Sequence, residues 1–214
     1  MKPVLLIGNK NYSSWSLRAW LALTQAGVEF DERLVWLDRP DTDASIRRYS
    51  PSGRVPCLID GDLTVWDSLA ICETANERYV AGRLWPSEPS QCARARAVSA
   101  EMHSSFVALR TYMPMDIRSR LLERGAAAQQ REDVARDIAR IQSLWSDCLD
   151  RSGGPFLFGD FSIADAMYAP VVTRFATYGV ALASPLADYS ARILALPAMQ
   201  RWSAAGANEP AIVQ

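Results

Sequence analysis

The sequence predicts a fold in two parts, an α+β domain followed by an all-α domain. Over residues 1–80, short β-like apolar runs alternate with helical patterns, whereas the β-like runs largely vanish in the rest of the chain. The segment 81–90 between these two parts contains one glycine and two prolines and is predicted to be a linker. We therefore expect an α+β domain over 1–80 and an all-α C-terminal domain over 91–214.

The first half is predicted to run β-α-β and then, after a helical or irregular segment, β-β-α. Strands are expected at 4–8, 30–37, 55–59 and 63–65, and helices at 14–25 and 68–79. Gly27 follows the first helix at a position where a left-handed residue commonly ends one. Gly61 lies between the last two strands, where a turn can join antiparallel partners. These elements predict a mixed sheet flanked by helices.

In the second half, apolar residues recur at helical spacing in two long stretches. These residues are Val98, Met102, Phe106, Leu109 and Met113 in the first stretch, and Val134, Ile138, Ile141, Trp145 and Cys148 in the second. We expect two long amphipathic helices, joined by a polar, alanine-rich connection, to form an antiparallel pair. The run from Ser162 to Asp165 has the capping-box pattern and predicts another helix start. Two shorter helices are expected around 185–194 and 197–204.

The composition disfavours several functional classes. The 214-residue chain has a net charge of -1, so it has no basic surplus to neutralise phosphates, and we expect no nucleic-acid partner. Without a secretory pattern or an apolar run long enough to span a bilayer, we expect a soluble, cytoplasmic protein with no membrane partner. The four cysteines are scattered and only one histidine is present, which argues against a disulfide framework and against a metal site.

Two adjacent serines, Ser13 and Ser14, stand at the predicted start of the first helix, in the run NYSSWSLRAWLAL. Serine is a favoured N-cap, and an isolated pair of this kind is usually no more than a cap. A helix N-terminus also concentrates unpaired N–H groups and positive partial charge, which stabilise an anion placed there. Capping and anion binding are compatible roles for neighbouring serines.

Four stretches of the chain resemble the cytosolic glutathione transferases, and the likeness covers essentially the whole chain. They are SSWSLRAWLAL, SPSGRVPCLID, VWDSLAICETANERY and GDFSIADAMYAP. The resemblance implies the glutathione transferase fold, with a thioredoxin-like N-terminal domain and an all-α C-terminal domain. It further implies a homodimer, glutathione as co-substrate, and a small electrophile as second substrate. The likeness is to serine-type, bacterial-like members.

The anion implied by the resemblance is the thiolate of bound glutathione. A free thiol has a pKa of about 8.5, so a hydroxyl donor and a helix terminus need lower it by only about 1.5–2 units. Ser13 best matches the family's thiol-binding position, Ser14 is the second candidate, and Tyr12 is a weaker one. Because position 13 is not cysteine, transferase or isomerase chemistry is favoured over mixed-disulfide exchange.

The resemblance also assigns the rest of the glutathione site. Val55, before Pro56, would pair its backbone groups with the cysteinyl part of glutathione, and Arg54 would either meet the glycyl carboxylate or be solvated. Ser68 would donate to the γ-glutamyl carboxylate at a helix N-terminus, while Asp67 would contact the ammonium group. Simpler interpretations exist for each: a strand edge for Pro56 and a helix cap for Asp67 or Ser68.

The electrophile is expected where the two halves meet. The candidate substrate-binding residues are Trp15, Phe106, Arg110, Tyr112 and Met113. Apolar residues at helical spacing belong more often to a core or a dimer interface, so no single one of these residues is strong evidence for a substrate site. His103 is expected to be a structural or interface residue rather than a base.

The sequence therefore predicts a glutathione transferase for detoxification, in which the thiolate attacks an electrophilic small molecule or assists peroxide reduction. One alternative is a glutathione-dependent cis-trans isomerase of the maleylacetoacetate type, because SSWS followed by LRAWLAL also resembles the zeta-like branch. That branch carries a Ser-Ser-Cys cluster whose cysteine is missing here. A second alternative is a non-catalytic binding module with this fold, against which the presence of Ser13, Pro56 and Ser68 argues.

Overall fold

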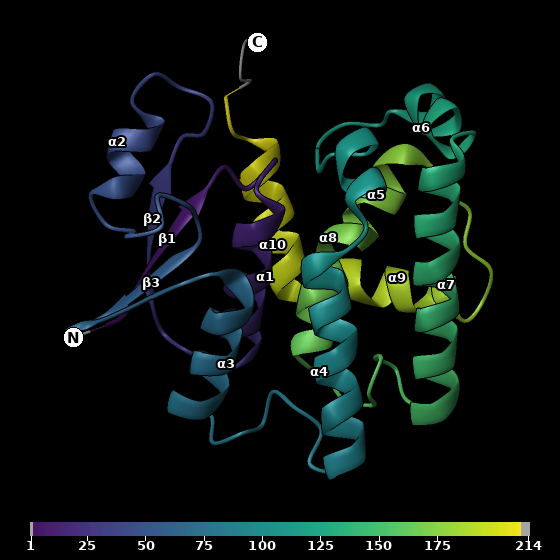
Figure 1. Cartoon of the computed structure of the whole chain (residues 1–214), viewed down its shortest axis with the longest axis horizontal. Coiled ribbons are helices and arrows are strands. Elements are labelled where there is room, and N and C mark those ends of the chain that lie inside the picture. Colours follow the sequence, from purple (N-terminus) through teal and green to yellow (C-terminus); the bar gives the residue numbers. More distant parts are fainter. Residues whose placement is uncertain (1, 211–214) are drawn as a thin grey trace.

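The computed structural model describes residues 2–210, which form two packed halves (Figure 1). The first half contains β1 (Val4–Gly8), α1 (Ser14–Gln25), β2 (Asp31–Val35), α2 (Thr42–Arg47), β3 (Cys57–Asp60), β4 (Leu63–Trp66) and α3 (Ser68–Arg78). The second contains α4 (Pro89–Ser104), α5 (Val107–Tyr112), α6 (Leu122–Gln129), α7 (Glu132–Ser152), α8 (Ile163–Tyr178), α9 (Leu186–Ala195) and α10 (Pro197–Ala207). The predicted succession of an α+β part and an all-α part is confirmed.

The four strands form one mixed sheet in the order β2-β1-β3-β4. β1 runs parallel to β2 and antiparallel to β3, so that Leu6 lies between Arg33 on one side and Cys57 on the other. β3 and β4 form an antiparallel hairpin. Gly61 supplies its turn with a φ of 64°, a conformation that glycine adopts without steric cost.

The core is continuous across the two halves. Leu5 and Ile7 join the main core from one face of β1, whereas Leu6 points to a smaller cluster that includes Ile46 of α2. α1 contacts α3 of its own half and α8 of the other half. In Figure 1, α1 lies between the sheet and the helices of the second half. α1 is therefore held from both sides.

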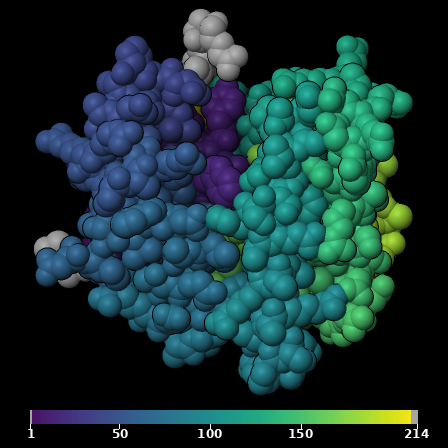
Figure 2. Space-filling view, in the orientation of Figure 1, coloured from purple at the N-terminus to yellow at the C-terminus, as the bar shows by residue number. Residues whose placement is uncertain are grey.

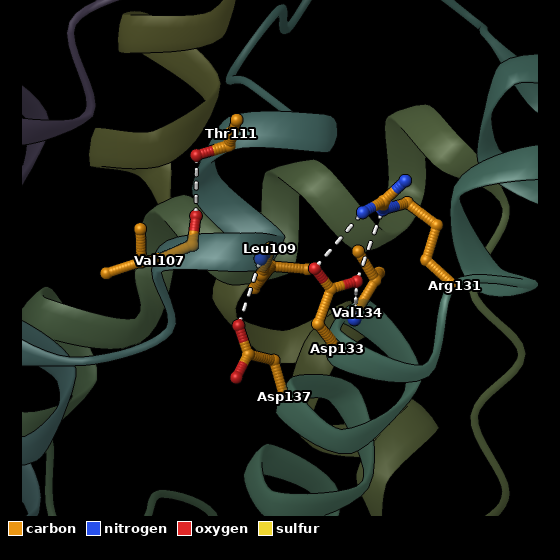
Figure 3. A network of polar contacts seen from close by, with 7 residues as sticks. All are labelled: Val107, Leu109, Thr111, Arg131, Asp133, Val134 and Asp137. Atoms are coloured by element: carbon orange, nitrogen blue, oxygen red, sulfur yellow. Dashed lines mark hydrogen bonds and ion pairs between the residues drawn. The ribbon is translucent and has the colours of Figure 1, made fainter.

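The single long helix predicted from Val98 to Met113 was wrong, because the helix is interrupted. α4 ends at Ser104, and Phe106 adopts a left-handed φ of 59° before α5 begins. Asp137 of α7 stabilises the new helix start, since its Oδ2 accepts the N–H of Leu109 at 3.0 Å (Figure 3). This acceptor comes from a distant part of the chain, so the local pattern does not reveal it.

The predicted connection between the two long helices contains a helix of its own, α6. A Cβ on Gly125 of α6 would lie 1.9 Å from the carbonyl oxygen of Tyr178, so only glycine allows α6 to approach α8 this closely. Arg131 and Asp133 pair where α7 begins, beside the Leu109–Asp137 contact (Figure 3).

α8 is the most deeply buried helix of the second half. Ser162 and Asp165 form its capping box, in which Asp165 Oδ2 accepts the N–H of Ser162 at 2.8 Å. Asp165 Oδ1 also accepts the N–H of Leu157 at 3.1 Å. Burial raises the pKa of Asp165 to about 6 because desolvation of the carboxylate outweighs these hydrogen bonds.

Across residues 2–210, no helix combines the length and the apolar character needed to cross a membrane. The same residues contain no group of three or more His, Cys, Asp or Glu side chains arranged to hold a metal ion.

Candidate functional site

A cleft separates the two halves on the face shown in Figure 2, where residues of the N-terminal segment lie between the blue and teal parts. It encloses about 490 Å³. Its walls are formed by Trp15, Leu37, Asp38, Thr42, Asp43, Ile46, Ser52, Gly53, Arg54, Val55, Pro56, Trp66, Asp67, Ser68 and His103. The structure thus brings together, with Trp15 beside them, the five residues predicted to bind the peptide part of glutathione: Arg54, Val55, Pro56, Asp67 and Ser68.

One wall of the cleft is the turn before β3. Gly53 takes a left-handed φ of 65° and donates its N–H to Ser50 O at 3.0 Å, which reverses the chain just before Arg54. The Val55–Pro56 peptide bond is cis. Arg54 is exposed at the cleft, while Pro56 is buried against the sheet.

A second wall is the N-terminus of α3. Asp67 caps this helix: its Oδ1 accepts the N–H groups of Leu69 at 2.9 Å and Ala70 at 3.2 Å. Ser68 follows, and its Oγ is buried without a hydrogen-bond partner among residues 2–210. A buried hydroxyl without a partner costs free energy. Because Ser68 also lies at a helix N-terminus, it fits an anionic acceptor such as a carboxylate.

His103 of α4 closes the cleft from the second half. Its Nε2 lies 3.1 Å from Asp67 Oδ2, and the Trp15 ring meets its ring edge-on, with centroids 5.3 Å apart. Sequence reasoning assigned His103 a structural or interface role and did not place it beside Asp67. No local pattern joins the two residues, because the contact depends on how the halves pack.

The serine pair lies just behind the lining of the cleft. Ser13 is the N-cap of α1: its Oγ accepts the N–H of Ser16 at 3.3 Å and donates to Ser16 Oγ at 2.8 Å. Ser16 Oγ in turn accepts the N–H of Gly8 at 3.0 Å, which ties the cap to the end of β1. Within the described part of the chain, the cleft lining includes Trp15 but neither Ser13 nor Ser14.

Ser14 points in a different direction, toward α8. Its Oγ accepts a hydrogen bond from Arg174 Nη2 at 3.3 Å, and its side chain is only 7% exposed. Tyr12, the weaker candidate, has its hydroxyl oxygen occupied by Arg118 Nη2 at 2.5 Å. The three candidate hydroxyls therefore have different partners.

Buried arginines surround the N-terminus of α1. Arg18 is fully buried, and its three guanidinium nitrogens have no hydrogen-bond partner within residues 2–210. Burial lowers the pKa of Arg18 to about 9, with repulsion from Arg174 and Arg110 adding to the effect. Burial likewise lowers the pKa of Arg174 to about 10. Both side chains remain cationic near neutral pH, so the region favours an anion.

The residues predicted to bind the second substrate separate into three groups. Arg110 and Arg18 both stack on Trp15, with their Cζ atoms 5.4 and 4.3 Å from its ring centroid. Phe106 and Met113 are buried in the main core. Tyr112 is exposed, and Arg131 stacks on its ring at 3.8 Å.

Comparison with known families identifies the class of protein to which this fold and this cleft belong. Residues 12–78 match the family described as "Glutathione S-transferase, N-terminal domain", and residues 124–205 match "Glutathione S-transferase, C-terminal domain". The chain belongs to the glutathione S-transferase family. Its fold is the thioredoxin-like domain followed by the helical domain that the sequence predicted.

Curated relatives have several names. A probable maleylacetoacetate isomerase of Vibrio cholerae is 26% identical over 92% of this chain and 94% of its own length. Glutathione S-transferase Z2 of Arabidopsis thaliana is 26% identical over 76% of this chain and 74% of its own. A stringent starvation protein A homolog of Coxiella burnetii is 25% identical over 78% and 73%.

Solved structures share the fold. A glutathione transferase homolog from Burkholderia, solved with bound glutathione, has a TM-score of 0.73 and 23% identity, covering 98% of this chain and 100% of its own. A tau class glutathione S-transferase from mango has a TM-score of 0.73 and 22% identity, covering 96% of both chains. At this level of identity the likeness concerns the fold alone.

Proposed function

We propose that the protein is a glutathione transferase that binds glutathione in the cleft and holds its sulfur as a thiolate at the N-terminus of α1. The observation that carries the proposal is the buried Ser68 hydroxyl at the N-terminus of α3, which has no hydrogen-bond partner among residues 2–210 and lies in the wall of the same cleft as Val55 and Pro56. A carboxylate-bearing peptide would satisfy that hydroxyl and lie along the turn before β3.

Glutathione is proposed to lie along two walls of the cleft. Ser68 donates to the γ-glutamyl carboxylate, and Asp67 supplies negative charge to the ammonium group beside it. The backbone of Val55 pairs with the cysteinyl unit in the manner of an added strand. Arg54, exposed at the cleft, meets the glycyl carboxylate. This arrangement directs the sulfur toward Ser13 and Ser14.

The proposed chemistry needs only a modest shift in the thiol pKa. A free thiol has a pKa of about 8.5, and lowering it by 1.5–2 units corresponds to roughly 2–3 kcal/mol. One hydroxyl donor, the positive end of α1 and the nearby arginines supply effects of that size. The thiolate then attacks an electrophilic carbon, or reduces a peroxide, on the side of the cleft formed by Trp15 and Arg110.

A specific observation favours one alternative activity. The relatives from Vibrio cholerae and Caenorhabditis elegans are both named probable maleylacetoacetate isomerase. In an isomerase, glutathione would add to a double bond and leave again without net consumption. A stringent starvation protein A homolog is also among the relatives. A non-catalytic binding module with this fold therefore stays as a third candidate function.

Detoxification, a cytoplasmic location and a homodimeric assembly belong to the same proposal. Trp66, at the end of β4 and in the wall of the cleft, is 46% exposed, and burial of its remaining apolar surface in a homodimer would be favourable. Sedimentation at micromolar concentration tests the assembly directly: a monomer contradicts it.

The function is tested by measuring what happens to glutathione. A transferase or an isomerase is expected to be retained on immobilised glutathione and to be eluted by free glutathione. A binding module that lacks the peptide site is expected to pass through. Stoichiometric consumption of glutathione with a halonitroaromatic electrophile would support the transferase. Turnover of maleylacetoacetate without consumption of glutathione would select the isomerase instead.

A further inference from the structure

The loop between β1 and α1, residues 9–12, is held by a carboxylate from the far end of the chain. Glu209, two residues beyond α10, accepts the N–H of Lys10 through Oε1 at 2.6 Å and the N–H of Asn11 through Oε2 at 3.1 Å. Adjacent backbone N–H groups in a turn form a concavity that binds anions, and here a side chain of the protein fills it. Hydrogen bonds to a charged acceptor are stronger than those between neutral groups.

α10 itself packs against the same loop. The buried indole of Trp202 donates its Nε1–H to Lys10 O at 2.8 Å. A Cβ on Gly206 would lie 3.0 Å from the backbone nitrogen of Asn11, so a larger residue there would crowd the loop. The close approach of α10 therefore brings Glu209 to the two N–H groups.

The loop in turn holds two walls of the cleft. Asn9 is fully buried, and its Oδ1 accepts the N–H of Leu37, a residue of the cleft lining, at 2.7 Å. Asn9 O also accepts the N–H of Ser13 at 2.8 Å, which fixes the entry into α1 two residues before Trp15. Trp15 lines the cleft as well. A displacement of the loop would therefore move both walls.

We propose that Glu209 is a positioning residue for the glutathione cleft, because its carboxylate fixes the loop that holds Leu37 and Trp15. This inference rests on the proposed function, since glutathione is the ligand whose binding is affected. Within residues 2–210, the cleft lining does not include Glu209, so it acts through the loop rather than on the ligand. The carboxylate orders the loop before glutathione arrives, and binding then does not have to supply that ordering cost.

Other contacts keep the loop attached when the carboxylate is removed. Asn11 Nδ2 donates to Asp116 Oδ1 at 2.8 Å, and Asn11 Oδ1 accepts the N–H of Arg118 at 3.0 Å. Arg118 Nη1 donates to the backbone oxygen of Glu209 at 2.9 Å, a contact that does not need the glutamate side chain. Glu209→Ala should therefore fold, with a loop that is less rigid and still in place.

The first test measures glutathione binding by calorimetry. Glu209→Ala is expected to raise the dissociation constant roughly three- to tenfold. Glu209→Gln should raise it by less, because the amide keeps one acceptor oxygen for the two N–H groups. Asn208→Ala, at an exposed neighbouring residue, is the matched control and should bind like the wild type.

A small carboxylate should rescue the alanine variant. Sodium formate, compared with sodium chloride at the same ionic strength, is expected to restore part of the affinity of Glu209→Ala by filling the vacated concavity, and to leave the wild type unchanged. A general loss of stability would not respond to formate in this way. Formate that affects Glu209→Ala no more than it affects the wild type would contradict the role of the carboxylate.

Amide hydrogen exchange tests the path through the loop without any ligand. Glu209→Ala should speed exchange at Lys10 and Asn11, which lose their acceptor, and also at Leu37, whose N–H is held by Asn9. Unchanged exchange at Leu37, or unchanged glutathione affinity in Glu209→Ala, would overturn the inference. A wild-type protein that binds no glutathione would instead reject the proposed function, and the exchange at Leu37 would still decide whether Glu209 fixes the wall of the cleft.

Discussion

Asp67 and His103 join the two halves of the molecule across the cleft, with Asp67 Oδ2 lying 3.1 Å from His103 Nε2. The same carboxylate caps α3 through its other oxygen. A single side chain therefore fixes the start of α3, beside Ser68, and also ties it to α4. The geometry of the proposed glutathione site depends on how the second half packs against the first.

Removing His103 should loosen the glutathione site with little effect on stability. Both partners are partly exposed, so His103→Ala is expected to cost under about 1 kcal/mol of unfolding free energy. The dissociation constant for glutathione should rise a few-fold, because Asp67 loses the contact that holds it at the cleft. His103→Gln, whose amide can still donate to Asp67, should retain most of the affinity. Equal binding by wild type and His103→Ala, measured by calorimetry, would contradict this role.

Ser68→Ala tests the carboxylate end of the site. A hydrogen bond to a charged group contributes about 1.5–3 kcal/mol, so the KM for glutathione should rise by roughly ten- to a hundredfold while kcat changes little. The alanine variant should fold normally, because the Ser68 hydroxyl has no partner within the described residues. Thr74→Ala, which removes a hydroxyl from the exposed face of the same helix, is the matched control. An unchanged KM in Ser68→Ala would reject the placement of the γ-glutamyl group.

The capping box of α8 should give the protein a stability that depends on pH. The pKa of Asp165 is raised from 3.8 to about 6 in the folded state, so the folded protein binds this proton more tightly than the unfolded chain. The contribution of Asp165 to stability is therefore greatest below the unfolded pKa and falls as the pH rises through the folded pKa, by on the order of 3 kcal/mol. Urea unfolding of wild type and Asp165→Asn across this window measures it.

The informative quantity is the difference between the two proteins, since other carboxylates titrate equally in both. The free energy of unfolding of wild type relative to Asp165→Asn should decrease from about pH 4 to about pH 6 and then level off. A difference that stays constant over this range would show that the buried carboxylate does not titrate as described.

The cysteines should react very unequally. Cys57, Cys72 and Cys148 are buried, and burial raises the pKa of each thiol, that of Cys72 to about 12. Cys92 is only partly buried. An aromatic disulfide reagent near neutral pH should therefore label Cys92 alone in the native protein, and Cys92→Ser should resist labelling until unfolded. Rapid native labelling of Cys92→Ser would contradict the buried state of the other three.

Features encoded by neighbouring residues could be predicted from the sequence. Ser13, Asp67 and Ser162 cap helices whose starts they mark locally. The strands around Gly61 could be predicted in the same way, because turn chemistry is local. The residues around Pro56 and Ser68 were placed by their resemblance to a family, and the fold then brought them to one cleft.

Features that depend on distant contacts could not be predicted. The helical spacing from Val98 to Met113 indicated a buried stripe. It did not reveal that a second helix begins at Val107, or that Asp137 accepts the N–H of Leu109 in its first turn. The contact between Ser14 and Arg174 likewise joins residues far apart in the chain. Spacing within one helix indicates which residues are buried, and it carries no information on which polar partner another helix supplies.

The central claim is that the N-terminus of α1 stabilises the glutathione thiolate. The most direct test is a pH titration of glutathione bound to the wild-type protein, followed by the ultraviolet absorbance of the thiolate and compared with free glutathione in the same buffer. We predict that the pKa of the bound thiol lies about 1.5–2 units below the free value of about 8.5. A bound thiol that ionises at the same pH as the free thiol would contradict the claim.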